Sequence, residues 1–293
     1  MREFFELYSM RKIIGPIVLL VLLLVMLTPY GCGNKKPEQL DSLQTDSLPV
    51  DTSEADSTDS LIMQTVMPKA ADELFDDFVF NFAANKKLQT KRIQFPLSVF
   101  RNGKLEKKIE KVDWKMEHFF MRQGYYTLIF DNPRQKQLVK DTTINNVVVE
   151  KIFFKRHTVQ QFEFNRINGE WIMTAINYKP INKNLNSSFL EFYQRFSTDS
   201  AFQVKSMADE VEFTAPDPED DFSTITGVIV PQQWPDFRPG LIPRGVIYNI
   251  LYGQKYKQSS RKILVIRGIA NGFEVELDFK RVGGKWKLVK FNS

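Results

Sequence analysis

A hairpin stretch that occurs twice decides how this chain is expected to fold. The first copy is Phe164-Asn165-Arg166-Ile167-Asn168-Gly169-Glu170-Trp171, and the second is Phe279-Lys280-Arg281-Val282-Gly283-Gly284-Lys285-Trp286. Each copy places a Phe, an Arg, an apolar residue, a Gly and a Trp at the same internal spacing, which one chance resemblance rarely supplies. We therefore predict two related halves, each closing on a long β-hairpin, with both Arg residues exposed beside their turns.

An aromatic helix is predicted at the start of each half. Three Phe residues at i, i+3 and i+7 share one helical face; they are Phe75, Phe78 and Phe82 in the first half and Phe189, Phe192 and Phe196 in the second. The offset between the helices is 114 residues (Phe189 against Phe75), and between the hairpins it is 115 (Phe279 against Phe164). We interpret the acidic residues around Asp76 as favourable charges at a helix N-terminus and not as a catalytic cluster.

Strand signals follow each helix. They are β-branched and aromatic segments bounded by turn residues, at 93–100, 104–110, 125–130, 146–154, 158–167 and 171–178, and then at 211–214, 224–230, 245–252, 261–267, 272–281 and 286–291. Between them, Asp113 predicts a short helix through His118 to Met121. We therefore predict an α+β fold of two tandem cone-like units, each an N-terminal helix packed on a curved antiparallel sheet, at residues 71–179 and 184–293.

Two further motifs carry a resemblance to a known family. They are Leu88-Gln89-x-x-Arg92-Ile93-x-Phe95-Pro96-Leu97 and Gly124-Tyr125-Tyr126-Thr127-Leu128-Ile129-Phe130. Together with the aromatic helices and the hairpins that end in Gly-x-Trp, they make the chain resemble a family of Bacteroides-type lipoproteins with tandem nuclear-transport-factor-two-like (cystatin-like cone) domains. The resemblance covers most of residues 71–293. It implies a fold and a compartment, and it implies no established activity.

The N-terminus has the layout of a secretory signal. Basic residues precede an apolar run from Ile13 to Leu27, which is shorter than the roughly 20 residues that span a bilayer. The run ends at Thr28-Pro29-Tyr30-Gly31-Cys32, which resembles a bacterial lipobox, although Pro29 stands where Leu is usual. We predict a lipoprotein signal peptide at residues 1–31 and a lipid on Cys32 that attaches the protein to a membrane. The alternative is an uncleaved inner-membrane anchor with Cys32 as an inert thiol.

Residues 32–70 are predicted to be the lipid anchor followed by a disordered acidic linker. Ser, Thr and Asp replace the apolar residues that a packed core needs. A flexible chain of about 37 residues spans on the order of 35 Å. Both interpretations of the N-terminus place the folded part outside the cytoplasm, and we expect a cell-envelope protein at the outer membrane, facing the periplasm or the cell surface.

Composition and motifs argue against several function classes. The formal net charge of +5 is spread along the chain, so no nucleic-acid partner is expected. The two histidines, His118 and His157, lack convergent ligands, and we predict no metal site. No serine lies in a Gly-x-Ser-x-Gly elbow and no Gly-rich loop opens a helix, so we predict no catalytic residue and no cofactor.

The candidate ligand-binding residues are aromatic and charged side chains that suit the mouth of a pocket. They are Trp114, Tyr125 and Tyr126, beside Glu117, in the first half, and Trp234, Asp236, Arg238 and Tyr248 in the second. The alternative is structural: the Tyr residues pack in strands, and Trp234 pins the proline-rich loop at 231–243.

We therefore favour a lipid-anchored binding module, with a small molecule or an envelope protein as its unknown partner. One alternative is a cone-fold enzyme acting on a small hydrophobic substrate, since the resemblance implies that a carboxylate base and a Tyr donor can meet in such a cone. The other is a structural scaffold of an envelope complex, with residues 234–238 as a contact surface.

Overall fold

The computed structural model describes residues 72–254 and 259–293. All of these residues belong to one compact unit. The predicted signal peptide at 1–31, the lipidation of Cys32 and the linker at 32–70 lie outside the described residues and stay predictions. Within the described ranges, no helix is long and apolar enough to cross a membrane.

Two helices and six strands make up the first half of the described chain. The helices are α3 (Phe75–Ala84) and α4 (Lys86–Lys91), and the strands are β1 (Ile93–Arg101), β2 (Lys104–Ile109), β3 (Tyr125–Phe130), β4 (Asn146–Phe153), β5 (Thr158–Ile167) and β6 (Glu170–Pro180). Short 3-10 helices connect them: η2 (Lys111–Asp113), η3 (Phe119–Arg122), η4 (Pro133–Lys140) and η5 (Phe154–Arg156). The short helix predicted from Asp113 through His118 to Met121 is wrong over residues 114–118, which are not helical, and only its end is helical, as the 3-10 helix η3.

The second half repeats this order after η6 (Ile181–Lys183). Its helices are α5 (Ser187–Phe196), α6 (Ser200–Lys205), η7 (Pro231–Gln233) and α7 (Trp234–Phe237), and its strands are β7 (Met207–Asp217), β8 (Asp220–Ile229), β9 (Val246–Leu251), β10 (Arg261–Gly268), β11 (Glu274–Val282) and β12 (Lys285–Asn292). The aromatic helices, the proline-rich loop and the closing hairpin appear where the sequence predicts them.

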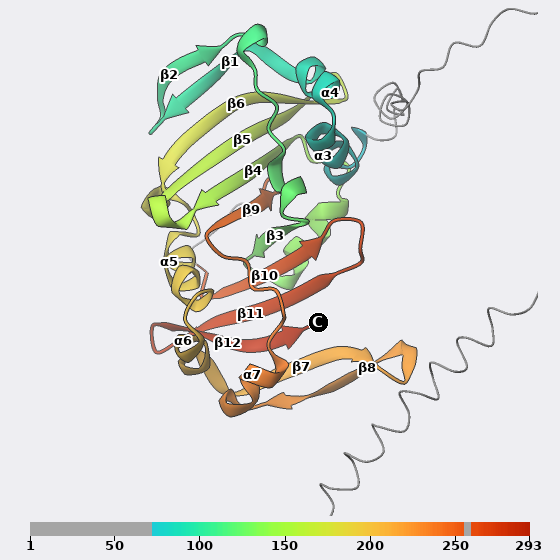
Figure 1. The fold of residues 1–293 in the computed structure, drawn as a ribbon, viewed down its shortest axis with the longest axis vertical. Helices are drawn as coiled ribbons and strands as arrows, with labels where there is room; N and C mark the ends of the chain where they lie inside the picture. Colours follow the sequence, from blue (N-terminus) through green and yellow to red (C-terminus); the bar gives the residue numbers. More distant parts are fainter. Residues whose placement is uncertain (1–71, 255–258) are drawn as a thin grey trace, which may run out of the picture. The chain divides into compact units, whose positions relative to one another are not determined.

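The strands of both halves form one sheet of 12 strands, in the order β2-β1-β6-β5-β4-β9-β3-β10-β11-β12-β7-β8 (Figure 1). Two strands cross between the halves at its centre. Strand β9 pairs antiparallel with β4, strand β3 pairs antiparallel with β10, and the two crossed strands meet in parallel at Thr127 and Asn249. The α+β class is confirmed, and the two segments predicted as separate domains share this one sheet.

The two aromatic helices pack on two separate hydrophobic cores. Phe78 and Phe82 of α3 belong to one core, and Phe189 and Phe196 of α5 belong to the other. The central strands supply both cores, since neighbouring strand residues point to opposite faces of a sheet. Along β10 the members alternate: Ile263 and Val265 lie in the α3 core, and Leu264 and Ile266 lie in the α5 core. The helices therefore cover opposite faces of the shared sheet.

Matching contacts recur in the two halves. Gln89 donates to the Phe82 carbonyl at 2.9 Å and accepts from Trp114 Nε1 at 3.2 Å. In the second half, Gln203 donates to the Phe196 carbonyl at 2.8 Å and accepts from Trp234 Nε1 at 3.0 Å. Gln203 lies 114 residues after Gln89, and Phe196 lies 114 residues after Phe82, whereas the two Trp residues do not share this offset. The repeat seen in the sequence is therefore also a repeat of hydrogen bonds.

The Arg of each hairpin stretch stacks on the Trp that follows its turn. The guanidinium carbon lies 4.7 Å from the ring centre in the Arg166–Trp171 pair and 4.9 Å in the Arg281–Trp286 pair. Arg281 is exposed, as predicted. Arg166 is half-buried, because its guanidinium also donates to the carbonyl oxygens of Thr142 at 2.7 Å and Glu73 at 2.6 Å.

Candidate functional site

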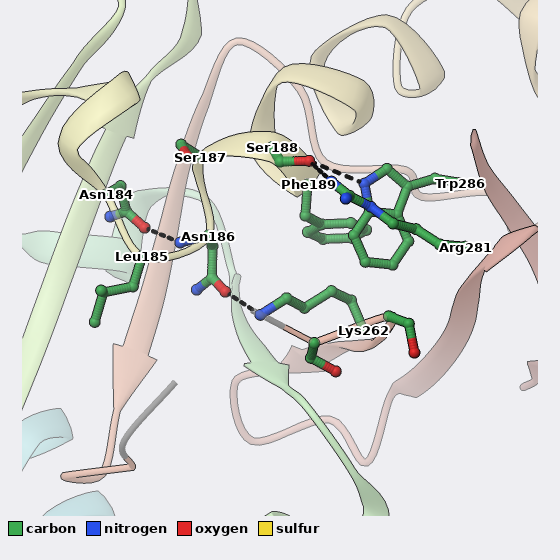
Figure 2. Close-up of a pocket in the computed structure, with 11 residues that line it drawn as sticks. Asn184, Leu185, Asn186, Ser187, Ser188, Phe189, Lys262, Arg281 and Trp286 are labelled. Carbon is green, nitrogen blue, oxygen red and sulfur yellow. Dashed lines mark hydrogen bonds between the residues drawn. The ribbon is translucent and has the colours of Figure 1, made fainter. Parts of the chain in front are cut away.

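A polar cavity of about 530 Å³ opens at the start of α5, and we name it the α5 pocket. Its walls come from the loop before α5, the first turn of α5, the start of β10 and the hairpin of β11 and β12 (Figure 2). The lining residues are Asn184, Leu185, Asn186, Ser187, Ser188, Phe189, Ser259, Ser260, Lys262, Arg281 and Trp286. Two cations and no carboxylate stand among them, so the lining favours a polar ligand.

One side of the α5 pocket is built around Ser188. Its hydroxyl oxygen accepts a hydrogen bond from Arg281 and another from Trp286 Nε1, the latter at 3.4 Å (Figure 2). Because Arg281 is also stacked on the Trp286 ring, its planar guanidinium is held in one orientation. An oriented guanidinium presents further N–H donors in a fixed fork.

The floor of the α5 pocket is a buried polar chain. Lys262 donates to the Asp131 carboxylate and to Asn186 Oδ1, the latter at 2.6 Å. The backbone N–H of Asn186 donates in turn to Asn184 Oδ1 at 2.8 Å, and Asn184 Nδ2 donates to Glu150 Oε1 at 2.7 Å. Each of these side chains is buried. The chain therefore fixes the position of every polar group that it presents to the cavity.

Glu150 anchors this chain below the pocket. It is 1% exposed and also accepts from Gln161 Nε2 at 2.8 Å and from Asn249 Nδ2 at 3.1 Å. Burial raises the pKa of the Glu150 carboxyl, and the amide donors of Gln161, Asn249 and Asn184 oppose that rise. Asn249 belongs to the crossed strand β9, so the strand exchange is what completes the set of donors.

A second, smaller cavity of about 370 Å³ surrounds Glu117. The Glu117 carboxylate accepts from Tyr248 Oη at 3.2 Å, from Lys151 Nζ at 3.2 Å and from the backbone N–H of Phe119 at 3.1 Å. Burial and the Glu117 charge raise the pKa of Tyr248. Phe119 has φ 48°, which is a strained conformation for a bulky residue. We name these four residues the Glu117 cluster.

The predicted ligand-binding residues do not gather in one place. Tyr248 joins the Glu117 cluster because β9 crosses to the first half. Trp114 and Trp234 are each bound by a Gln, as described above, and Trp234 is only 1% exposed. Tyr125 packs against the α5 core. Asp236 and Arg238 are exposed, and Arg238 donates to Ser200 Oγ at 3.3 Å.

Tyr126 lies instead beside an acidic residue of α3. Asp76 accepts from Tyr252 Oη, and its other oxygen lies 3.9 Å from Arg267 Nη1. Burial raises the pKa of Asp76, and the Tyr252 hydrogen bond and the Arg267 charge oppose that rise. Burial likewise raises the pKa of Tyr126. The interpretation of Asp76 as helix chemistry alone therefore missed a buried polar contact with the sheet.

The residues of the α5 pocket were missed because each is unremarkable in its local sequence. The signal that could have found them is the repeat itself: an offset of 114 aligns Asp72 with Asn186 and Leu74 with Ser188. Polar residues therefore replace an acid and an apolar residue at the start of the second helix. Within the described ranges, no three His, Cys, Asp or Glu side chains gather closely enough to hold a metal ion.

Comparison with known proteins identifies a family and a fold. Residues 54–293 match a family described as a domain of unknown function, DUF4348. The chain is also similar to the crystal structure of an NTF2-like protein from Bacteroides fragilis NCTC 9343, with 42% sequence identity, a TM-score of 0.71, and coverage of 78% of this chain and 98% of that one. No curated protein matches the chain. The expectation of an NTF2-like α+β fold is confirmed, and the chain belongs to the DUF4348 family.

Proposed function

We propose that this chain is a lipid-anchored binding protein of the cell envelope, and that it holds a small polar ligand in the α5 pocket. The observation that carries the proposal is the α5 pocket itself. Its volume of about 530 Å³ lies within the roughly 300–1,000 Å³ of small-molecule sites. Its polar groups converge from four segments; the buried chain holds Lys262, Asn186 and Asn184, and the contacts with Ser188 and Trp286 hold Arg281.

The interior between α3 and the sheet argues for a ligand site outside it. Phe78, Phe82 and Phe164 are each fully buried, and Phe164 lies 6.0 Å from Phe78 and 5.3 Å from Phe82 between ring centres. The α5 side is filled in the same way by Phe189, Phe196 and Phe279. These rings occupy the space in which a cone fold would hold a substrate, so the start of α5 is the better candidate.

We also propose that the described chain is a tandem pair of NTF2-like units. The matching Gln–Trp and Arg–Trp contacts of the two halves support this interpretation. In it, β3 and β9 have exchanged places between the units, since each completes the sheet of the other half. Such an exchange makes the two units interdependent, because neither holds all the strands of its own sheet.

The lipid anchor is proposed from the sequence alone. Its support is the basic and apolar N-terminal segment that ends at Cys32, followed by the acidic linker. The test is growth with a labelled fatty acid: the wild type should carry the label and sediment with membranes, and Cys32→Ala should carry none. Equal labelling of the two proteins would remove the anchor from the proposal.

Ligand binding at the α5 pocket is tested by a variant that copies the first half. Ser188→Leu introduces the residue that stands at the equivalent position, Leu74, and fills polar space with an apolar side chain. Thr198→Leu, an exposed site just beyond α5, is the matched control. A fragment set screened by ligand-observed NMR against the full-length chain in detergent micelles should give binders that Thr198→Leu keeps and Ser188→Leu loses. Equal binding to both variants would place the site elsewhere.

A cone-type enzyme is the second candidate function, and the Glu117 cluster is the observation that favours it. A carboxylate, a Tyr hydroxyl and a strained Phe119 meet there beside a cavity, as they can at catalytic sites. An envelope extract incubated with the wild type and with Glu117→Gln, and compared by mass spectrometry, tests it. A compound consumed only by the wild type would support catalysis, and identical extracts would leave binding as the function.

A further inference from the structure

The helix that opens into the α5 pocket lacks an anion at its N-terminus. In the first half, α3 has Asp76 and Asp77 in its first turn, whereas the first turn of α5 has no acidic residue. The N-terminus of a helix carries about half a positive charge and several N–H groups without helical partners. In α5, however, the backbone N–H of Ser187 donates to the Asn184 carbonyl, and those of Phe189 and Leu190 donate to the Asn186 carbonyl. Among the described residues of this first turn, the N–H of Ser188, which lines the polar cavity, is the one left for an external anion.

The N-cap residue of α5 does not supply this missing group. Asn is a favoured N-cap residue because its side-chain oxygen can accept from the first N–H groups of the helix. In Asn186, however, the oxygen accepts from Lys262 at 2.6 Å, and no side-chain cap is formed. The other side-chain atom, Nδ2, is buried without a hydrogen-bond partner, and the residue is 1% exposed. Because this Nδ2 atom has no surface open to the cavity, Asn186 shapes the wall of the pocket and does not itself donate to a ligand there.

Arg281 adds a charge that no described residue neutralises. Among the described residues, no carboxylate is in salt-bridge contact with Arg281, and its hydrogen bond goes to the neutral Ser188 hydroxyl. Lys262 differs, because Asp131 compensates it. Burial lowers the pKa of Lys262, Asp131 opposes that change, and the nearby Arg281 charge lowers the pKa further. An anion between the two cations would relieve this repulsion.

We infer that the α5 pocket takes the oxyanion group of its ligand, a carboxylate or a phosphate, at the first turn of α5. Arg281 and the backbone N–H of Ser188 are the donors that hold it, while the Ser259 and Ser260 side of the cavity receives the remainder of the molecule. This inference rests on the proposed function and specifies its ligand class. Arg suits such a group because its fork can donate two parallel hydrogen bonds to a carboxylate or phosphate.

Matched pairs of ligands and of variants test the inference. Sodium benzoate and benzamide have nearly the same shape and differ in charge, and inorganic phosphate tests the oxyanion alone. The full-length chain in detergent micelles is titrated with each of the three. Arg281→Gln removes the cation, and Asn186→Asp places a carboxylate where the first half has Asp72. Lys280→Gln, the exposed neighbour on β11 that does not line the pocket, is the control for charge removal.

Benzoate should bind the wild type and Lys280→Gln at least tenfold more tightly than benzamide, and phosphate should compete with it. Both Arg281→Gln and Asn186→Asp should lose this preference, the second because it adds a negative charge to the lining of the pocket. A wild type that binds benzamide as tightly as benzoate would overturn the inference and leave the proposed function standing. Failure of every neutral and charged fragment to bind would overturn both. A preference retained by both variants would show that the anion binds elsewhere.

Discussion

Asn186 occupies, before α5, the position that Asp72 occupies before α3. The Asp72 carboxylate accepts from Arg92 Nη1 and Nη2, each at 2.9 Å, and forms a buried ion pair. At the position equivalent to Arg92 the second half has Ser206. The ion pair of the first half is therefore absent from the second, where the Asn186 side chain accepts from Lys262 instead. The first half closes this corner with a buried ion pair, and in the second half Asn186 lines the α5 pocket.

The first prediction is that Asp72→Asn destabilises the protein by about 3 kcal/mol. Arg92 is only 4% exposed, and removing one partner of a buried ion pair leaves an uncompensated charge. Glu170, 3.0 Å from Arg92 but half exposed, replaces only part of the lost interaction. Denaturant unfolding measures the loss.

The double variant Asp72→Asn with Arg92→Ser is its control, since it installs the two neutral residues, Asn and Ser, that the second half has at these positions. It should be more stable than Asp72→Asn alone, because no buried charge is left behind. A double variant less stable than the single one would contradict this explanation of the corner.

A second prediction concerns the Gln–Trp contacts that the halves share. Gln203→Leu removes the acceptor of Trp234 Nε1 and the donor to the Phe196 carbonyl. The cost should be about 2–4 kcal/mol, because two buried polar groups lose their partners. Gln137→Leu, at an exposed site, should change stability by less than about 0.5 kcal/mol. Equal effects of the two variants on the melting temperature would show that the contact adds no stability.

A third prediction is a pH dependence that comes from Glu150. Burial raises the pKa of this carboxyl, so the folded state binds more protons than the unfolded state above the ordinary pKa of about 4.3. Stability contributed by Glu150 is therefore present below that pH and is lost as the pH rises through the raised value.

Glu150→Gln should remove this loss. Asn249 Oδ1 is buried without a partner in the wild type. If the Asn249 side-chain amide flips, the amide of the new Gln side chain can donate to this oxygen. Relative to the wild type, the variant should gain on the order of 1 kcal/mol between about pH 4 and pH 8. Unfolding curves at several pH values measure the difference. A constant difference across that range would show that Glu150 does not titrate as described.

The local features of the fold could be predicted from the sequence. The Phe faces of α3 and α5 follow from spacing, and the hairpins at Gly169 and Gly284 follow from turn chemistry, because both are decided within a few residues. The left-handed φ values of these glycines, 82° and 78°, fit the predicted turns. The helix predicted after Asp113 failed because contacts of Gln89 with Trp114 and the Glu117 backbone hold that segment in a non-helical form.

The exchange of β3 and β9 could not be predicted in this way. Tyr125–Phe130 and Val246–Leu251 are both short and mostly apolar, and each would suit the position beside β4 or the position beside β10. Contacts between residues far apart in the sequence decide which strand takes which position: Thr127 Oγ1 donates to the Tyr248 carbonyl, and Asn249 Nδ2 donates to Glu150. The meeting of Glu117 with Tyr248 depends on this exchange, and for that reason the candidate residues were assigned to the wrong neighbours.

The side-chain amide of Asn186 provides the most direct test of the α5 pocket as the binding site. Its Nδ2 resonance, assigned by its absence in Asn186→Ala, is followed by NMR while benzoate is added to the ¹⁵N-labelled full-length chain. We predict a saturable shift of this resonance, with the same midpoint as the binding curve, in the wild type and in Lys280→Gln. Binding of benzoate without any shift of the Asn186 amide would contradict it.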